Sequence, residues 1–357
     1  MKSFIPHPSS LIPHPFPTMI IELCRRAMKE HGIPGLSIGI IRNGRPWLVE
    51  GLGRQRLGER RMVDGGTLFH MASITKMFTG TAIMQLVEED RVGLEDKVLK
   101  IIPRFRLNDP RFRRITLRHL LKHTSGLPDV TDFGWDRPEY DDGALMRHID
   151  GMSALRLQSE PGKKYSYSDL GFEVLGGVIA AVSGLAYEEY LRRHVLAPAG
   201  MTESTFLLTE VDHRHLARPH VRDATGKIRP SEIFPYNRRH APSSTLYSSA
   251  SDMVKWMKVL VEKGKGLQGR ILPRSAYGDM WRRSNLTHGV FWLEVGMGFF
   301  AGRYKRMRFV GHEGSDRGFR SSMVVFPRSG LGISIAVNHD GEHLKGLMES
   351  IFEILPA

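Results

Sequence analysis

The stretch Phe69-His70-Met71-Ala72-Ser73-Ile74-Thr75-Lys76-Met77-Phe78 places a serine and a lysine three residues apart, where a periodic apolar pattern begins. The pattern continues through Ile83, Leu86 and Val87 and ends at the acidic run of residues 88–90, which predicts a helix with Ser73 in its first turn. Residues three apart share one face of a helix. The backbone N–H of Ser73 would lack a partner within the helix and would be free to face a ligand.

Ser73 and Lys76 are therefore candidate catalytic residues. A serine hydroxyl is a poor nucleophile until a neighbouring group takes its proton, and a nearby neutral lysine amine can do this. Four-residue matches of this kind also arise by chance in helices, where the lysine is usually solvated. The pair needs support from the rest of the chain.

Length and composition narrow the class of protein. A chain of 357 residues with 41% hydrophobic residues predicts two domains, or one large domain with an insertion. The formal net charge of +13 comes from basic residues scattered along the chain, which favours a basic solvated surface over a nucleic-acid partner. No apolar run approaches the roughly 18 residues that cross a bilayer.

The single cysteine and the N-terminal residues each exclude some classes of feature. Cys24 is the only cysteine, so the chain has no intramolecular disulfide and no cysteine metal cluster, and its apolar neighbours predict a small buried side chain. Residues 1–18 are too rich in proline for a signal peptide and are expected to form a disordered tail. A cytoplasmic location is the expectation from the absence of an evident signal peptide, with a periplasmic or secreted location as the alternative.

Strand patterns occur near both ends of the chain. Two apolar runs at 36–41 and 47–49 flank Asn43-Gly44, which is a hairpin signal. Residues 35–39 also match the Gly-x-Ser-x-Gly pattern of another hydrolase class. That pattern needs a strand, a sharp turn and a helix, whereas Ser37 lies within a strand that leads to a second strand. Ser37 is therefore interpreted as structural.

The remaining patterns predict the architecture. Short strands at 299–300, 307–310, 322–326 and 333–337 precede a closing helix at 342–354, and most of residues 98–235 reads as helical. The expected fold is α/β (α+β), with an antiparallel sheet built from N- and C-terminal strands and flanked by helices. Residues 19–80 plus 240–357 would form the sheet domain and 81–239 a helical insertion, with the active site between them.

Three further stretches follow the first one in order: His123-Thr124-Ser125-Gly126-Leu127-Pro128, Tyr165-Ser166-Tyr167-Ser168-Asp169-Leu170-Gly171-Phe172 and Gly311-His312-Glu313-Gly314-Ser315. Together with Ser-x-x-Lys they resemble the serine β-lactamase-like family, which includes class C β-lactamases, D-alanyl-D-alanine carboxypeptidases, D-amino-acid peptidases and β-lactamase-like esterases. The resemblance extends from about residue 32 to residue 341 and includes the segment 246–252. It implies the β-lactamase/transpeptidase-like fold.

The resemblance implies a role for each matching residue. Ser73 matches the nucleophile, Lys76 its base, and Tyr167 the tyrosine that shuttles protons. The Lys76 cation near this phenol is expected to lower the pKa of Tyr167. Residues 312–314 match the third motif, and the backbone N–H groups of Ser73 and Ser315 would form the oxyanion hole, with His312 and Gly314 in the substrate site. The resemblance implies no metal or organic cofactor.

Asp169 departs from the family pattern, in which asparagine is usual at this position. A carboxylate accepts hydrogen bonds but cannot donate to a substrate carbonyl, so amide recognition is in question. Two histidine groups, at 213–220 and 339–343, lack the spacing of a metal site, so no metal is predicted there.

The sequence therefore predicts a serine hydrolase that forms an acyl-enzyme with a small ester, β-lactam or D-amino-acid peptide. An esterase, or an enzyme like the D-amino-acid peptidases and carboxypeptidases, with weak or no β-lactamase activity fits the motifs best. A penicillin-recognising binding protein with little turnover, and a non-catalytic sensor with the same fold, are the alternatives. These motifs leave the natural substrate and the oligomeric state open.

Overall fold

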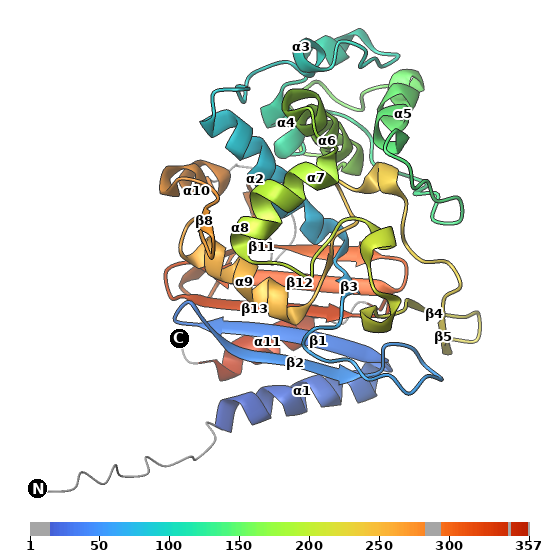
Figure 1. Cartoon of the computed structure of the whole chain (residues 1–357), viewed down its shortest axis with the longest axis vertical. Helices are drawn as coiled ribbons and strands as arrows, with labels where there is room; N and C mark the ends of the chain where they lie inside the picture. The colour runs from blue at the N-terminus through green and yellow to red at the C-terminus, as the bar shows by residue number, and fades with distance from the viewer. Residues whose placement is uncertain (1–14, 283–293, 342–343, 356–357) are drawn as a thin grey trace, which may run out of the picture.

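A seven-stranded antiparallel sheet forms the centre of the molecule (Figure 1). The structure, a computed structural model, describes residues 15–282, 294–341 and 344–355. The strand order is β2-β1-β13-β12-β11-β10-β9. The strands are β1 (Gly35–Arg42), β2 (Arg45–Gly53), β9 (Glu294–Val295), β10 (Phe300–Tyr304), β11 (Met307–Asp316), β12 (Phe319–Phe326) and β13 (Leu331–Val337). Because both ends of the chain supply strands, the predicted fold class is confirmed.

Side-chain alternation separates two hydrophobic cores. In β13, Ile333, Ile335 and Val337 face the core formed with α1 (Pro15–His31) and α11 (Leu344–Ile354), whereas Ala336 belongs to the core on the other face. This alternation follows from the two-residue period of a strand. Cys24 is fully buried in the α1 layer, as predicted, and burial raises the pKa of its thiol to about 12.

Helices cover the opposite face and extend away from it, with α1 and α11 below the sheet in Figure 1 and most of the others above. The helices on this side are α2 (Thr75–Glu88), α3 (Val98–Ile101), α4 (Leu117–Leu121), α5 (Ala144–Gly151), α6 (Asp169–Ser183), α7 (Tyr187–Leu191), α8 (Ala197–Ala199), α9 (Ala250–Val261) and α10 (Arg274–Met280). Short strand pairs join β3 (Phe69–His70) to β6 (Tyr247–Ser248), β4 (His220–Arg222) to β5 (Ile228–Pro230) and β7 (Lys265–Gly266) to β8 (Gly269–Arg270).

The N-terminal prediction requires a correction. The disordered tail was expected to cover residues 1–18, yet α1 begins at Pro15, so residues 15–18 are helical. Proline is well tolerated in the first turn of a helix because the first N–H groups have no helical acceptor. The rest of the predicted tail lies outside the described residues.

The hairpin prediction at Asn43-Gly44 is confirmed. Both residues have positive φ, 53° and 69°, which is the conformation of the two-residue turn that joins twisted antiparallel strands. Ser37 pairs with Gly51 of β2 and Ala336 of β13 and is buried, so it lies within a central strand and not at a turn. The division into a sheet domain and a helical insertion domain remains a prediction.

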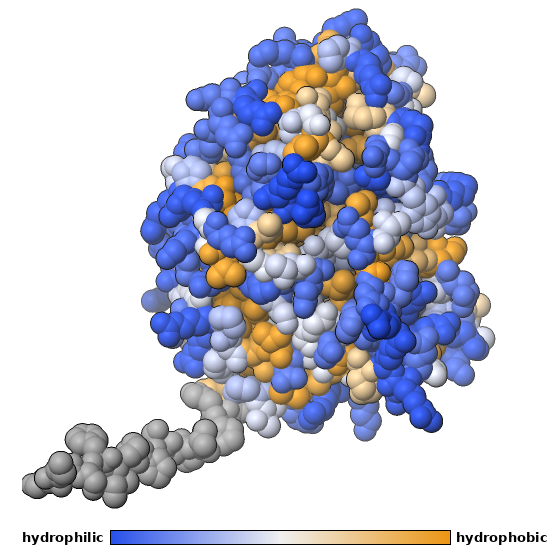
Figure 2. All heavy atoms as spheres, in the orientation of Figure 1, coloured by the Kyte–Doolittle hydropathy of each residue, from blue (hydrophilic) through white to orange (hydrophobic). Residues whose placement is uncertain are grey.

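The surface and the helix lengths bear on possible partners. The face drawn in Figure 2 is largely hydrophilic, with small apolar areas between polar side chains. Within the described ranges, no single helix is long and apolar enough to cross a membrane. The segments Asp169–Ser183 and Tyr187–Ala199 meet that test only as a pair, and they are bent by 77°.

The packing of β1 yields a stability prediction. Ile38 is fully buried opposite Ile335, so Ile38→Ala should lower the free energy of unfolding by about 2–5 kcal/mol in urea denaturation. Met19→Ala in α1, where the side chain is 47% exposed, is the control and should change it by about 0.5 kcal/mol or less. Equal effects of the two substitutions would contradict this packing.

Candidate active site

A strained turn presents Ser73 at the start of α2. Ala72 has φ 47°, in the left-handed region that costs an L-residue energy, and it lies in the single helical turn Ala72–Ile74. The Thr75 hydroxyl donates to the Ala72 carbonyl (2.7 Å) and accepts the Leu246 N–H (3.0 Å). These bonds fix the turn against the segment before α9. Ser73 remains partly exposed while its neighbours are buried.

Lys76 is fully buried, and its Nζ has three oxygen acceptors. It donates to Ser73 Oγ (3.0 Å) and to the Ser243 carbonyl (2.8 Å), and it forms an ion pair with Asp169 Oδ1. A lysine is almost never fully buried unless it is paired. This arrangement matches the three N–H donors of an ammonium group and aligns one of them with the serine hydroxyl.

Tyr167 lies beside Ser73 and Lys76. Its ring stacks on His123 at 4.4 Å between centroids and lies 5.0 Å from Lys76 Nζ, and its hydroxyl hydrogen-bonds to Ser73. The expected lowering of its pKa is wrong: desolvation and the Asp169 charge raise the pKa of Tyr167 well above its ordinary value, and the bond to Ser73 offsets only part of this. The phenol therefore stays protonated, and its oxygen is placed to accept from the Ser73 hydroxyl.

The segment 123–128 holds the Tyr167 loop in place. His123 Nδ1 accepts the Ser168 N–H (3.1 Å), the His123 carbonyl accepts the Ser166 N–H (2.8 Å), and the Ser168 hydroxyl donates to the Pro128 carbonyl (2.7 Å). Ser168 also caps α6 through the Gly171 N–H. The stretch that begins at His123 therefore positions Tyr167 and the first residue of α6.

Asp169 is that first residue, and it is buried. Burial raises the pKa of its carboxyl to about 7, although the nearby Lys76 charge works in the opposite direction. Its backbone N–H donates to Asp129 Oδ1 (2.8 Å), and that second acidic group also raises the pKa of Asp169. Asp169, where asparagine was expected from the resemblance, therefore lies directly beside the candidate base Lys76.

The third motif lies on an open edge of β11. Pairing with β10 ends at Gly311, so residues 312–316 pair only with β12 and face the Ser73 turn on the other side. A Cβ at Gly314 would lie 2.3 Å from the Met71 carbonyl oxygen and 2.3 Å from Ser321 Oγ. Only glycine permits this approach, which brings the backbone of Ser315 to the segment that carries Ser73.

His312 is buried beside the same group of side chains. Its Nδ1–H donates to the Glu313 carbonyl (2.5 Å), and its ring centroid is 4.6 Å from Phe300 and 6.3 Å from Tyr167. Burial, together with the Lys76 charge, lowers the pKa of His312 to about 3. His312 is therefore a neutral imidazole.

Further polar contacts here were not predicted from the sequence. Asp316, at the end of β11, accepts from His70 Nε2 (2.8 Å) and from the Ser244 hydroxyl, which ties the strand to both segments beside Ser73. The Ser243 carbonyl, an acceptor for Lys76, is a backbone group with no sequence signature. The Ser243 hydroxyl donates to Glu173 (3.2 Å), which lies one turn after Asp169 in α6.

Glu173 also joins a cluster with His148 and His240, whose nitrogen and oxygen atoms lie within 4.8 Å of one another. His220 instead contacts the Asn338 carbonyl at 2.9 Å, and His339 lies 3.8 Å from Asp340. The two histidine groups considered in the sequence therefore form no comparable cluster within the described residues.

Comparisons with known proteins agree with this geometry. Residues 20–353 match the family described as Beta-lactamase. Protein flp of Staphylococcus aureus (strain MW2) is 28% identical over 335 residues, which cover 89% of this chain and 62% of that protein. Penicillin-binding protein 4 of Amycolatopsis lactamdurans is 25% identical over 316 residues, covering 87% of this chain and 82% of the relative. This chain thus spans less than two thirds of Protein flp.

Solved structures show the same fold. The octameric penicillin-binding protein homologue from Pyrococcus abyssi superimposes with a TM-score of 0.82 at 26% identity, over 94% of this chain and 76% of that chain. The D-amino acid amidase from Ochrobactrum anthropi SV3, in complex with L-phenylalanine amide, gives a TM-score of 0.76 at 24% identity. This superposition covers 94% of this chain and 96% of the amidase chain. At that identity the second likeness supports the fold alone.

The environment of His312 yields a titration prediction. Because burial and the Lys76 charge disfavour the imidazolium, His312 should stay neutral in every buffer above about pH 4. NMR of protein labelled at the histidine ring carbons would follow it, with His312→Gln identifying the resonance. A midpoint near the ordinary value of 6.5 would show that the ring is solvated and that this environment is wrong.

Proposed function

Because the chain belongs to the β-lactamase family, we propose that it is a serine hydrolase that cleaves ester or amide bonds through an acyl-enzyme on Ser73. The observation that carries the proposal is the contact of 3.0 Å between Lys76 Nζ and Ser73 Oγ, at a turn where Ser73 is the exposed member. A buried amine within hydrogen-bond reach of an accessible hydroxyl is the arrangement that activates a serine.

In the first half of the reaction, neutral Lys76 takes the Ser73 proton as Oγ attacks the carbonyl carbon. The negative charge that develops on the carbonyl oxygen would be held by the backbone N–H groups of Ser73 and Ser315, for which each lost donor typically costs about 10² to 10³ in rate. The tetrahedral intermediate then expels the alcohol or amine, which receives a proton. Tyr167, a protonated phenol hydrogen-bonded to Ser73, is placed to relay that proton.

In the second half, a water molecule attacks the acyl-enzyme, and its proton passes to the same pair of residues. The acid is released, and Ser73 regains its hydrogen. Since Lys76 must be neutral to accept a proton, its ion pair with Asp169 opposes catalysis, because the carboxylate stabilises the ammonium form. The balance between these two groups therefore sets the pH range of activity.

Two features favour simple esters over β-lactams. His312 is neutral, so it supplies no fixed positive charge for the carboxylate that penicillins and cephalosporins carry. Asp169 cannot donate to a substrate amide carbonyl when it is ionised. An esterase therefore fits the site best, a D-amino-acid peptidase fits it when Asp169 is protonated and can donate, and a binding protein that acylates with little turnover is the second candidate.

The time course of p-nitrophenol release from a short-chain ester separates the candidates. Steady turnover would support the hydrolase, a burst of one equivalent per chain would favour the binding protein, and no release would favour a sensor with the same fold.

The nucleophile assignment is tested by substitution. Ser73→Ala and Lys76→Ala should each lower ester hydrolysis by at least about 10³-fold, because nucleophile and base act as a unit. Labelling by a fluorophosphonate should be lost in Ser73→Ala. Ser37→Ala is the matched control, since Ser37 is buried within β1, and it should label like the wild type. Loss of labelling in Ser37→Ala alone would move the nucleophile to the Gly-x-Ser-x-Gly segment.

Substrate preference follows from the third motif. A hydrogen bond to a charged group contributes about 1.5–3 kcal/mol, so the missing cation at position 312 should make kcat/KM for a chromogenic cephalosporin at least about tenfold lower than for a short-chain ester. Steady-state kinetics on one enzyme preparation would measure both values. Similar specificity constants would show that another group supplies the positive charge.

Asp169 yields a pH prediction. Above about pH 7 the Asp169 carboxyl ionises and holds a negative charge beside Lys76 Nζ. Asp169→Asn removes this charge, so the rising limb of kcat/KM against pH should move to lower pH. The control is Asp136→Asn, since that carboxylate is exposed and paired with Arg137. Superimposable profiles for wild type and Asp169→Asn would mean that Asp169 does not tune the base.

A further inference from the structure

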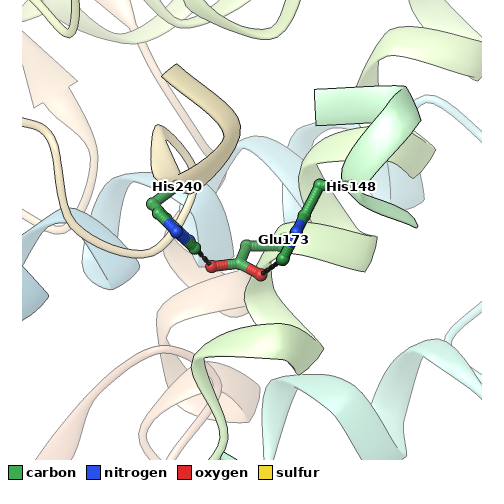
Figure 3. A group of neighbouring side chains, drawn as sticks. All are labelled: His148, Glu173 and His240. Atoms are coloured by element: carbon green, nitrogen blue, oxygen red, sulfur yellow. Dashed lines mark hydrogen bonds and ion pairs between the residues drawn. The ribbon is translucent and has the colours of Figure 1, made fainter. Parts of the chain in front are cut away.

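A second cluster of reactive side chains lies behind the candidate active site. His148 of α5, Glu173 of α6 and His240, in the turn Arg238–His240, point toward one another from three separate elements (Figure 3). His148 Nε2 lies 2.7 Å from Glu173 Oε2, and His240 Nδ1 lies 2.5 Å from Glu173 Oε1. The Glu173 and His240 side chains have no exposed surface, and that of His148 is 18% exposed.

The second ring nitrogen of His240 is also close to an acceptor. Nε2 lies 3.0 Å from the Phe133 carbonyl oxygen. If Nε2–H donates to this carbonyl, the neutral ring has its lone pair on Nδ1, and that lone pair faces a carboxylate oxygen. Two acceptors at this distance require a second proton on the ring between them, and a metal ion could take the place of that proton only if the two groups moved apart, because zinc–ligand bonds are about 2 Å long.

Arg239 offers the competing arrangement. Its Nε lies 3.0 Å from the same His240 Nε2, and if it donates there, Nδ1 carries the hydrogen and donates to Glu173. The cluster would then be a set of hydrogen bonds with no need for a metal. The two arrangements differ in whether Nδ1 has a lone pair, so they differ in their ability to bind a metal.

The neighbouring groups favour a cation at the carboxylate. Glu173 offers one carboxylate oxygen to each imidazole, Oε2 to His148 and Oε1 to His240. The backbone carbonyl behind His240 and the Ser243 hydroxyl behind Glu173, at 3.2 Å, correspond to the outer contacts that orient metal ligands. One nitrogen of each imidazole and one carboxylate oxygen of Glu173 lie within 4.8 Å of one another, so the three side chains can converge on one ion.

We propose that His148 Nε2, His240 Nδ1 and the Glu173 carboxylate bind a divalent transition-metal ion, with Zn²⁺ as the best match. Two imidazoles and one carboxylate are a recurrent ligand set for zinc, and a fourth position would be taken by water or Ser243 Oγ. The ion would replace the proton between the rings and the carboxylate, which would move apart to metal–ligand spacing. The partly exposed edge of His148 provides a route from solvent.

The site would lie next to the candidate catalytic lysine without being part of the acyl-transfer machinery. Ser243 connects the two, because its hydroxyl contacts Glu173 and its carbonyl contacts Lys76. The proposal is independent of the nucleophile assignment, since it concerns metal affinity and not turnover.

The test is a Zn²⁺ titration of the full chain after treatment with a chelator, in competition with a chromophoric zinc indicator. We expect one equivalent of Zn²⁺ per wild-type chain. His148→Ala and Glu173→Gln should each weaken this binding by at least about tenfold, because each removes one of three protein ligands. Zinc should also raise the thermal unfolding midpoint of the wild type but not that of His148→Ala.

His213→Ala is the matched control. His213 and His215 form an exposed pair that can hold zinc adventitiously, so this variant should retain the equivalent that His148→Ala loses. The thermal unfolding midpoint of each variant, measured without zinc, checks that the variant is folded. Equal zinc affinity in the wild type and a folded His148→Ala, or binding that disappears in His213→Ala, would overturn the proposal. The cluster would then be the hydrogen-bonded arrangement in which Arg239 donates to His240.

Discussion

A buried ammonium group needs an acceptor for each of its protons, and this requirement organises the site. Removing a charge from water costs several kcal/mol even after the protein relaxes, so Lys76 is stable in the interior only when its partners are in place. Those partners are Ser73 in the adjacent turn, Asp169 at the start of α6 and the Ser243 carbonyl before α9. The bonds of one side chain therefore join three segments that are distant in sequence.

Close backbone packing supplies the second constraint. The Met71 carbonyl accepts the Ser321 hydroxyl (2.7 Å) and lies where a side chain at position 314 would be, so β11 and β12 lie directly against the nucleophile turn. The left-handed Ala72 is held by the Thr75 hydroxyl, which donates to the Ala72 carbonyl. The strain at the turn is offset by the sheet on one side and by the segment 243–246 on the other. The two backbone N–H groups proposed to hold the oxyanion thus belong to closely packed backbone segments.

Much of the architecture was predictable because it follows local patterns. The Asn43-Gly44 turn, the C-terminal strands and the helix after Ser73 are each encoded by periodicity or turn chemistry within a few residues. The start of α1 at Pro15 was missed because a proline-rich segment resembles a disordered tail, although proline suits a first helical turn.

The electrostatics were less predictable, because they depend on burial and on residues that only the fold brings together. Proximity to Lys76 suggested a lowered pKa for Tyr167, whereas desolvation raises it. His148, Glu173 and His240 have no recognisable spacing in the sequence. The contact between Lys76 and Ser243 uses a backbone oxygen, which no residue pattern marks.

The central claim is that an acyl-enzyme forms on Ser73. The most direct measurement of it is intact-protein mass spectrometry during turnover of a slow p-nitrophenyl ester, followed by peptide mapping. The account predicts a transient mass increase of one acyl group on the peptide that contains Ser73, which decays as the acid is released. Product release with no acylated protein, or an acyl group on any other residue, would contradict it.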